Sequence, residues 1–162
     1  MMSFRAQLVL EEQRRLFDVW LDAAAGARMP TRQAFQPKQF AALLPWVSLV
    51  GVETPADGRT NPALKVKVAG SQLRDVLGID PAGQLLCPLA PGGAGTFLTS
   101  IATGEPGCGA TYMPDGKGGA GVMRFWLRLP LGGADAVEQV LGLDIAVSRM
   151  RAPDWALQRI AV

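Results

Sequence analysis

The stretch from Val122 to Leu129, Val-Met-Arg-Phe-Trp-Leu-Arg-Leu, decides the fold class. Its side chains change character at every second residue, which is the period of a β-strand with one buried face. We expect the apolar set to point into the protein and the basic set, with its tryptophan, to point outward. The inward set is Met123, Phe125, Leu127 and Leu129, and the outward set is Arg124, Trp126 and Arg128.

Working outward from this strand, similar patterns predict strands over residues 46–53, 64–68, 107–113 and 137–147. Helical patterns cover residues 4–27, 38–44, 72–77 and a segment from 94 or 96 to 102. Pro130 is expected to close the strand that begins at Val122. Strands joined by short turns pair antiparallel, so we predict an α+β domain with a five-stranded antiparallel sheet and helices packed on one face.

The segment from residue 4 to 27 reads as an amphipathic helix, because Leu8, Leu16 and Trp20 recur at multiples of four. Gly26 and Pro30 would end it. We expect this helix to cover the outer face of the sheet, where Trp126 lies beside Val50 and Val140, and to help build a homodimer. The predicted interface residues are Leu8, Leu16, Trp20 and Trp126.

Composition narrows the function further. The chain has 162 residues, a net charge of +2, two cysteines and no histidine. A near-neutral chain is not drawn to nucleic acid or anionic membranes by bulk charge, and without histidine it lacks the usual metal ligand and general base. We therefore predict a single globular domain with no metal, no cofactor and no enzymatic activity. No apolar run is long enough to span a membrane, and the cysteines suggest reduced thiols, so a soluble cytoplasmic protein is expected.

Three features keep more than one interpretation. Arg32 could bind a ligand carboxylate or phosphate, or it could tie down the proline-flanked segment around it. Trp126 between two arginines could contact nucleic acid, although helix cover or a dimer contact fits the low net charge better. The glycine-rich stretches do not fit the pattern of a phosphate-binding loop and are interpreted as connectors.

A mainly apolar pocket is predicted on the inner face of the sheet. It would suit a small apolar ligand held by few hydrogen bonds, with Arg32 as a further polar anchor, and glycines around Cys108 would leave space for it. A filled core is the alternative. The predicted lining is Leu49, Val66, Val68, Phe97, Ile101, Cys108, Tyr112, Phe125, Leu127 and Leu143.

The order of elements and several local motifs resemble the PAS-like family of α-proteobacteria, a PAS subfamily formerly catalogued as a domain of unknown function. The resemblance covers roughly residues 17–147. It rests on Trp20, Pro30-x-Arg32-x-x-x-x-Pro37, Leu43-Leu44-Pro45-Trp46-Val47-x-Leu49-Val50-x-Val52, Val68-Ala69-Gly70-Ser71, Gly78-Ile79-Asp80-x-x-Gly83 and Leu127-x-Leu129-Pro130-Leu131. The chain departs from haem-binding PAS sensors, since it has no histidine, and from flavin-adduct light sensors, since Cys87 does not lie in their motif.

The resemblance implies a stand-alone sensory or signalling module that acts through protein–protein contacts and is gated by a small apolar ligand. A ligand-free interaction adaptor is the alternative, and an enzyme with unrecognised chemistry is the third. We divide the chain into an N-terminal helix (1–28), a PAS-like domain (29–148) and a C-terminal tail (149–162).

Overall fold

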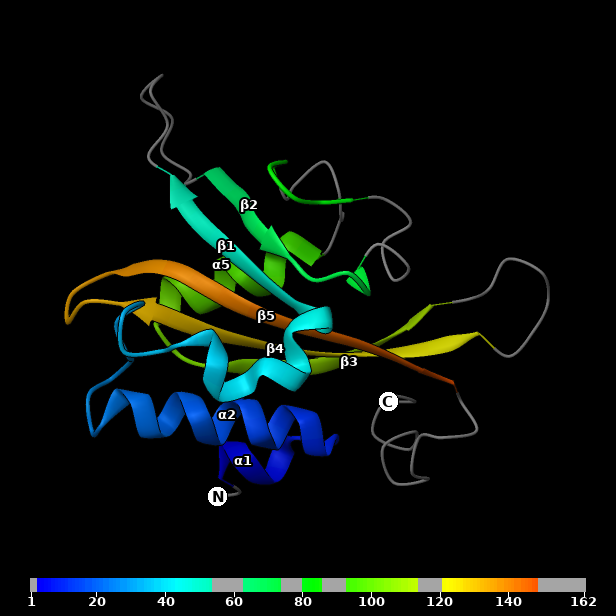
Figure 1. Cartoon of the computed structure of the whole chain (residues 1–162), viewed down its shortest axis with the longest axis horizontal. Coiled ribbons are helices and arrows are strands. Elements are labelled where there is room, and N and C mark those ends of the chain that lie inside the picture. Colours follow the sequence, from blue (N-terminus) through cyan, green and yellow to red (C-terminus); the bar gives the residue numbers. More distant parts are fainter. Residues whose placement is uncertain (1–2, 54–62, 74–79, 86–92, 114–120, 149–162) are drawn as a thin grey trace.

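The computed structural model describes residues 3–53, 63–73, 80–85, 93–113 and 121–148. Its centre is a five-stranded antiparallel sheet in the order β2-β1-β5-β4-β3 (Figure 1). The predicted α+β class and the five antiparallel strands are confirmed. The strands are β1 Val47–Glu53, β2 Ala63–Ala69, β3 Gly107–Met113, β4 Val122–Gly132 and β5 Val137–Ser148.

Helices lie on both faces of the sheet. On one face lie α1 (Phe4–Gln7), α2 (Glu11–Ala24) and the 3₁₀ segment η1 (Pro37–Trp46), and on the other lies α5 (Gly93–Thr103) (Figure 1). The expectation that the short helices share one face is therefore wrong for η1, which packs on the α2 side. The helix predicted over 72–77 and the tail from 149 fall almost wholly outside the described residues.

The N-terminal helical segment is broken rather than continuous from residue 4 to 27. The main-chain N–H groups of Val9 and Leu10 both donate to the side-chain oxygen of Gln13, each at 3.0 Å, and this caps the start of α2. The amide nitrogen of the buried Gln13 side chain donates to the carbonyl of Trp126 at 3.1 Å. One glutamine thus begins the helix and fastens it to β4.

Strand β2 contains a β-bulge at Lys67. Leu49 pairs with Val68 and Val50 pairs with Val66, so Lys67 is an extra residue with no partner on β1. A bulge reverses the alternation beyond it, so Val66 faces α5 while Val68 faces η1. The sequence prediction that both valines share the inner face is wrong for this reason.

The sequence analysis predicted that Pro130 ends β4. In the structure Pro130 lies within the strand and pairs with Val140. Strand β3 has already ended at this level, because its first residue pairs with Arg128. Pro130 therefore lies where β4 is an edge strand, and an edge position tolerates the missing N–H. The Pro130 carbonyl accepts a hydrogen bond of 2.8 Å from the indole N–H of the buried Trp20.

The two faces of the sheet carry separate clusters. The larger one joins the α2 stripe and η1 to the apolar faces of β4 and β5, where Leu127 and Leu143 are fully buried. The smaller one joins Phe97 of α5 to Val50 and Val140. The face with Val50 and Val140 is thus covered by α5, and the predicted inner and outer faces are exchanged. The alternation along β4 was right, but its basic face does not meet solvent at Arg128, because α5 covers that side chain.

Candidate functional site

The face beneath α5 carries a buried ion pair. Arg128 of β4 makes two hydrogen bonds, of 2.9 and 3.0 Å, to the carboxylate of Asp144 on the neighbouring strand β5. Its Nε donates to the hydroxyl of Thr96 in α5 at 3.0 Å, and its side chain is 2% exposed. A charge this deeply buried is tolerated only when it is paired and hydrogen-bonded. The guanidinium thus links β4, β5 and α5 at one point.

Aromatic rings enclose this guanidinium. The ring of Phe97 lies 4.1 Å from it and the ring of Trp126 lies 5.4 Å from it, both within the range of cation–π contacts. Gly142 permits this approach, because a Cβ there would lie 2.9 Å from Phe97 and 3.1 Å from Arg128.

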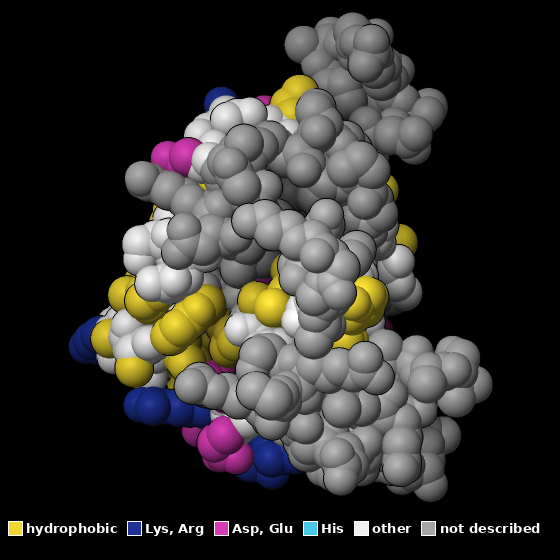
Figure 2. All heavy atoms as spheres, turned by 90° about the vertical axis from the view of Figure 1, so that its right-hand side faces the viewer, with side chains coloured by type: hydrophobic (Ala, Val, Ile, Leu, Met, Phe, Trp, Pro, Cys, Tyr) yellow, Lys and Arg dark blue, Asp and Glu magenta, His cyan; other side chains and the backbone are white. Residues whose placement is uncertain are grey.

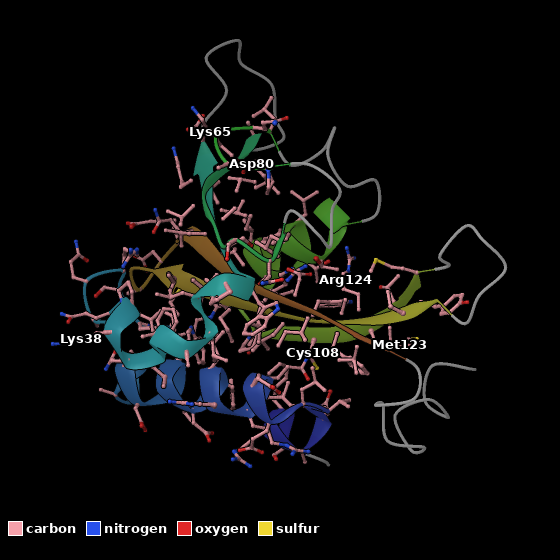
Figure 3. All side chains as sticks on the ribbon, turned by 45° about the vertical axis from the view of Figure 1, so that its right-hand side comes forward. Lys38, Lys65, Asp80, Cys108, Met123 and Arg124 are labelled. Carbon is pink, nitrogen blue, oxygen red and sulfur yellow. The ribbon has the colours of Figure 1, made fainter. Side chains whose placement is uncertain are left out.

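A second arginine lies beside the pair. The Nε of Arg124 is 3.8 Å from an Asp144 oxygen, and it is buried without a hydrogen bond. Figure 3 shows Arg124 on the side of the sheet that carries α5, whereas Cys108 lies on the side of α1 and α2. Asp144 therefore faces two guanidinium groups. The sequence analysis did not single out Asp144, although a carboxylate inside an apolar strand opposite basic residues was a usable signal.

A cleft of about 340 Å³ opens next to this cluster, between α5 and the start of β3. Trp126 borders it, together with hydroxyl side chains of α5. A Cβ at Gly109 would lie 2.5 Å from the Trp126 ring, so glycine lets the indole lie across β3. The space that the glycines around Cys108 were expected to leave is thus occupied by this indole on the α5 side. The residues bordering the cleft are Gly95, Thr96, Thr99, Ser100, Thr103, Glu105, Pro106, Gly107 and Trp126.

The pocket predicted from the sequence does not form as one site. Its residues divide between the two faces of the sheet for two reasons. The α5 residues pack on the face opposite to the one predicted for them, and the bulge at Lys67 places Val66 and Val68 on different faces. Val66, Phe97 and Ile101 belong to the α5 face. The α2 and η1 face holds Leu49, Val68, Cys108, Tyr112, Phe125, Leu127 and Leu143.

Arg32, Leu49 and Val68 do meet, in a different and smaller pocket. It has a volume of about 130 Å³ and lies between the segment that carries Arg32, η1 and the sheet. An Arg32 Nη donates to the carbonyl of Phe35 at 3.3 Å. Arg32 therefore does tie down its own segment, but through a single long hydrogen bond. Its place beside a pocket leaves the ligand role as a prediction.

The predicted interface is mostly internal. Leu8, Leu16 and Trp20 are at most 3% exposed and belong to the chain's own core. Trp126 lies on the opposite side of the sheet. These four residues therefore do not form one surface that a second copy could cover, and the homodimer keeps no support from them.

Apolar side chains still reach the surface elsewhere. Val68 is 56% exposed and Leu85 is 50% exposed, and both belong to the β2 side of the sheet. The right-hand side of the molecule shows hydrophobic side chains in its middle and charged ones at the level of α1 and α2 (Figure 2).

The reactive groups in the described part of the chain are few. Burial raises the pKa of the Cys108 thiol, which favours its neutral, unreactive form. Within the described ranges, no three side chains of cysteine, aspartate or glutamate come together as metal ligands would. The same ranges contain no helix of the length and apolar character needed to cross a membrane.

Comparison with known protein families matches residues 10–104 to the PAS domain. This match spans more than half of the 162 residues, so the chain belongs to the PAS domain family, a family of sensory and signalling modules. No curated protein sequence matches the chain. Among solved structures, the chain is similar to the light-state structure of the LOV domain of the blue-light photoreceptor Aureochrome1. The identity is 13%, the TM-score is 0.47, and the match covers 77% of this chain and 98% of that one.

Proposed function

We propose that the chain is a sensory module that binds a small, largely apolar molecule in the cleft beside α5 and signals through contacts with other proteins. The observation that carries this proposal is the position of the cleft. Trp126 borders it, and the same indole packs against Arg128, which holds α5 to the sheet through Thr96. A ligand that moves α5 or the indole would strain this buried ion pair.

The lining suggests the chemistry of the ligand. Trp126 offers a flat apolar surface, and Glu105 also borders the cleft. The hydroxyls of Thr99 and Thr103 donate to carbonyls of α5 at 2.9 and 2.8 Å, so each offers its oxygen to a ligand as an acceptor. Such a site suits a small planar molecule with one or two polar groups. We assign no catalysis to the chain, since histidine is absent from its sequence. The cytoplasmic location remains a prediction.

Gly95 offers a clean test, because it borders the cleft and a Cβ there would meet nothing within 4 Å. We expect Gly95→Trp to fill the cleft, while Gly95→Ala adds only a methyl group. Both variants would be compared with the wild type in a thermal-shift screen of small planar metabolites. Compounds that stabilise the wild type and Gly95→Ala but not Gly95→Trp would support sensing.

Native mass spectrometry of protein purified from its own host would report any bound molecule and the oligomeric state together. If no molecule is retained and no compound shifts the wild type, the ligand-free interaction adaptor becomes the better description.

A further inference from the structure

The pocket beside Arg32 lies on the opposite face of the sheet from the α5 cleft, and the proposed function does not involve it. Two stacked rings, Phe35 and Phe40, with centroids 4.8 Å apart, form part of its wall. Leu131 and Leu141 belong to the buried apolar face of the sheet beneath. The remaining apolar wall comes from η1, β1 and β2. A cavity of about 130 Å³ with such walls accommodates a phenyl ring or a short branched chain.

Two apolar side chains at this pocket are unusually exposed. Val68 is 56% exposed and Leu44 is 39% exposed. Val68 lies here because the bulge at Lys67 turns it toward η1. An apolar ligand seated in the pocket would remove part of both side chains from water, which is favourable in proportion to the area covered.

Arg32 is the charged residue among those that border the pocket. Within the described ranges its guanidinium has one hydrogen bond, at 3.3 Å to the Phe35 carbonyl, and no carboxylate within 4.0 Å. The neighbouring Lys38 is exposed and is not among the bordering residues, and Figure 3 shows it at the outer edge of the molecule. A half-buried guanidinium that retains unused donors favours a planar anion, and a carboxylate matches its geometry with two parallel hydrogen bonds.

We propose that this pocket binds a small monocarboxylic acid, with its apolar body between Phe35, Phe40 and the sheet and its carboxylate on Arg32. The site is independent of the α5 cleft, since the two are on opposite faces of the sheet. A phosphate ester fits less well, because a dianion would find a single cation here.

The test is a titration of the full chain with sodium phenylacetate, followed by amide chemical shifts and by calorimetry. We expect shifts concentrated in residues 32–44 and 47–49 and a dissociation constant on the order of 1 mM or lower. Benzyl alcohol, which has a similar ring and no charge, should bind about tenfold more weakly.

Arg32→Gln should weaken phenylacetate binding by about tenfold or more and leave benzyl alcohol binding unchanged. Arg32→Lys, which keeps the charge, should retain part of the affinity and also guards against a folding defect in the glutamine variant. Gly95→Trp, on the other face, should leave the phenylacetate-induced shifts of residues 32–44 and 47–49 as they are in the wild type.

The proposal is overturned if phenylacetate produces no shifts at about ten times the expected dissociation constant. Equal binding of the acid and the alcohol, or an unchanged affinity in Arg32→Gln, would overturn it as well. If phenylacetate does not bind at Arg32 but the thermal-shift screen finds compounds that Gly95→Trp no longer binds, the proposed function stands and this further site does not. If phenylacetate binds at Arg32 but the screen finds no such compound, the ligand role of the α5 cleft is rejected and the carboxylate site stands.

Discussion

Asp144→Leu should be among the most destabilising single substitutions in the chain. It removes the carboxylate that makes two hydrogen bonds of 2.9 and 3.0 Å to a guanidinium that is 2% exposed. It also removes the carboxylate that lies 3.8 Å from the Nε of Arg124. Leaving a buried charge without its partner costs about 3–5 kcal/mol, and here two cations would be left.

That cost is large against the usual 5–15 kcal/mol or so of a domain. For a chain of this length it corresponds to a fall in melting temperature of roughly 6–20 °C. Arg128→Met should cost less than Asp144→Leu, because Arg124 remains beside the carboxylate and can take over part of the pairing. The double variant should be more stable than Asp144→Leu alone, because it leaves one unpaired cation, Arg124, instead of two.

Urea unfolding followed by far-ultraviolet circular dichroism and tryptophan fluorescence would measure all three variants. The control is Asp18→Leu, which removes a carboxylate from the exposed ion pair with Arg5 and should change stability little. The reasoning would be refuted if Asp144→Leu costs less than about 1 kcal/mol, or if the two single effects simply add in the double variant.

Two further predictions rest on close contacts, at Gly109 and Trp20, and a third rests on the burial of Cys108. Gly109→Val should displace the Trp126 indole, which lies 2.5 Å from the position of the added carbon, and so shift the tryptophan fluorescence and cost about 1–3 kcal/mol in urea; an unchanged spectrum would contradict this. Trp20→Phe should cost about 1–3 kcal/mol, because it leaves a buried main-chain oxygen of β4 without its donor, and Trp20→Leu should cost no less. Iodoacetamide should alkylate Cys108 slowly at neutral pH in a Cys87→Ser background, since burial raises the thiol pKa and so lowers the thiolate fraction. The rate should keep rising with pH past the ordinary thiol pKa of about 8.5, and fast labelling at neutral pH or a plateau by that pH would contradict this.

The strands could be predicted from the sequence because each one alternates over several residues. Strand β3 has the predicted bounds, and the faces shared by the side chains of β4 were correct. What the alternation could not tell was which face meets which helix. Trp126 and Arg128 look solvent-exposed in sequence, and only the packing of α5 makes their face interior.

The candidate sites were harder to predict. The α5 cleft depends on which face of the sheet α5 covers, and the pocket beside Arg32 depends on an irregularity in the pairing of β1 with β2. The bulge at Lys67 moves Val68 to the face of Arg32, and no residue type in the sequence announces it. The helix break at Leu10 depends on a glutamine side chain that reaches a strand more than a hundred positions away. Such long-range contacts override local pattern, and they explain why the predicted pocket was divided while one of its anchors, Arg32, was still found beside a cavity.

The position of Pro130 bears on how this sheet avoids aggregation. Where β4 extends past β3, an open strand edge would invite pairing with another chain. Proline supplies no donor there, its carbonyl is occupied by Trp20, and the N–H of Gly132 donates to the carbonyl of Pro30 at 3.1 Å. The overhang thus offers an incoming strand few partners for an intermolecular ladder. Loosening α2, which carries Trp20, would expose this edge, so damage to the packing of this helix would promote self-association before the sheet itself unfolds.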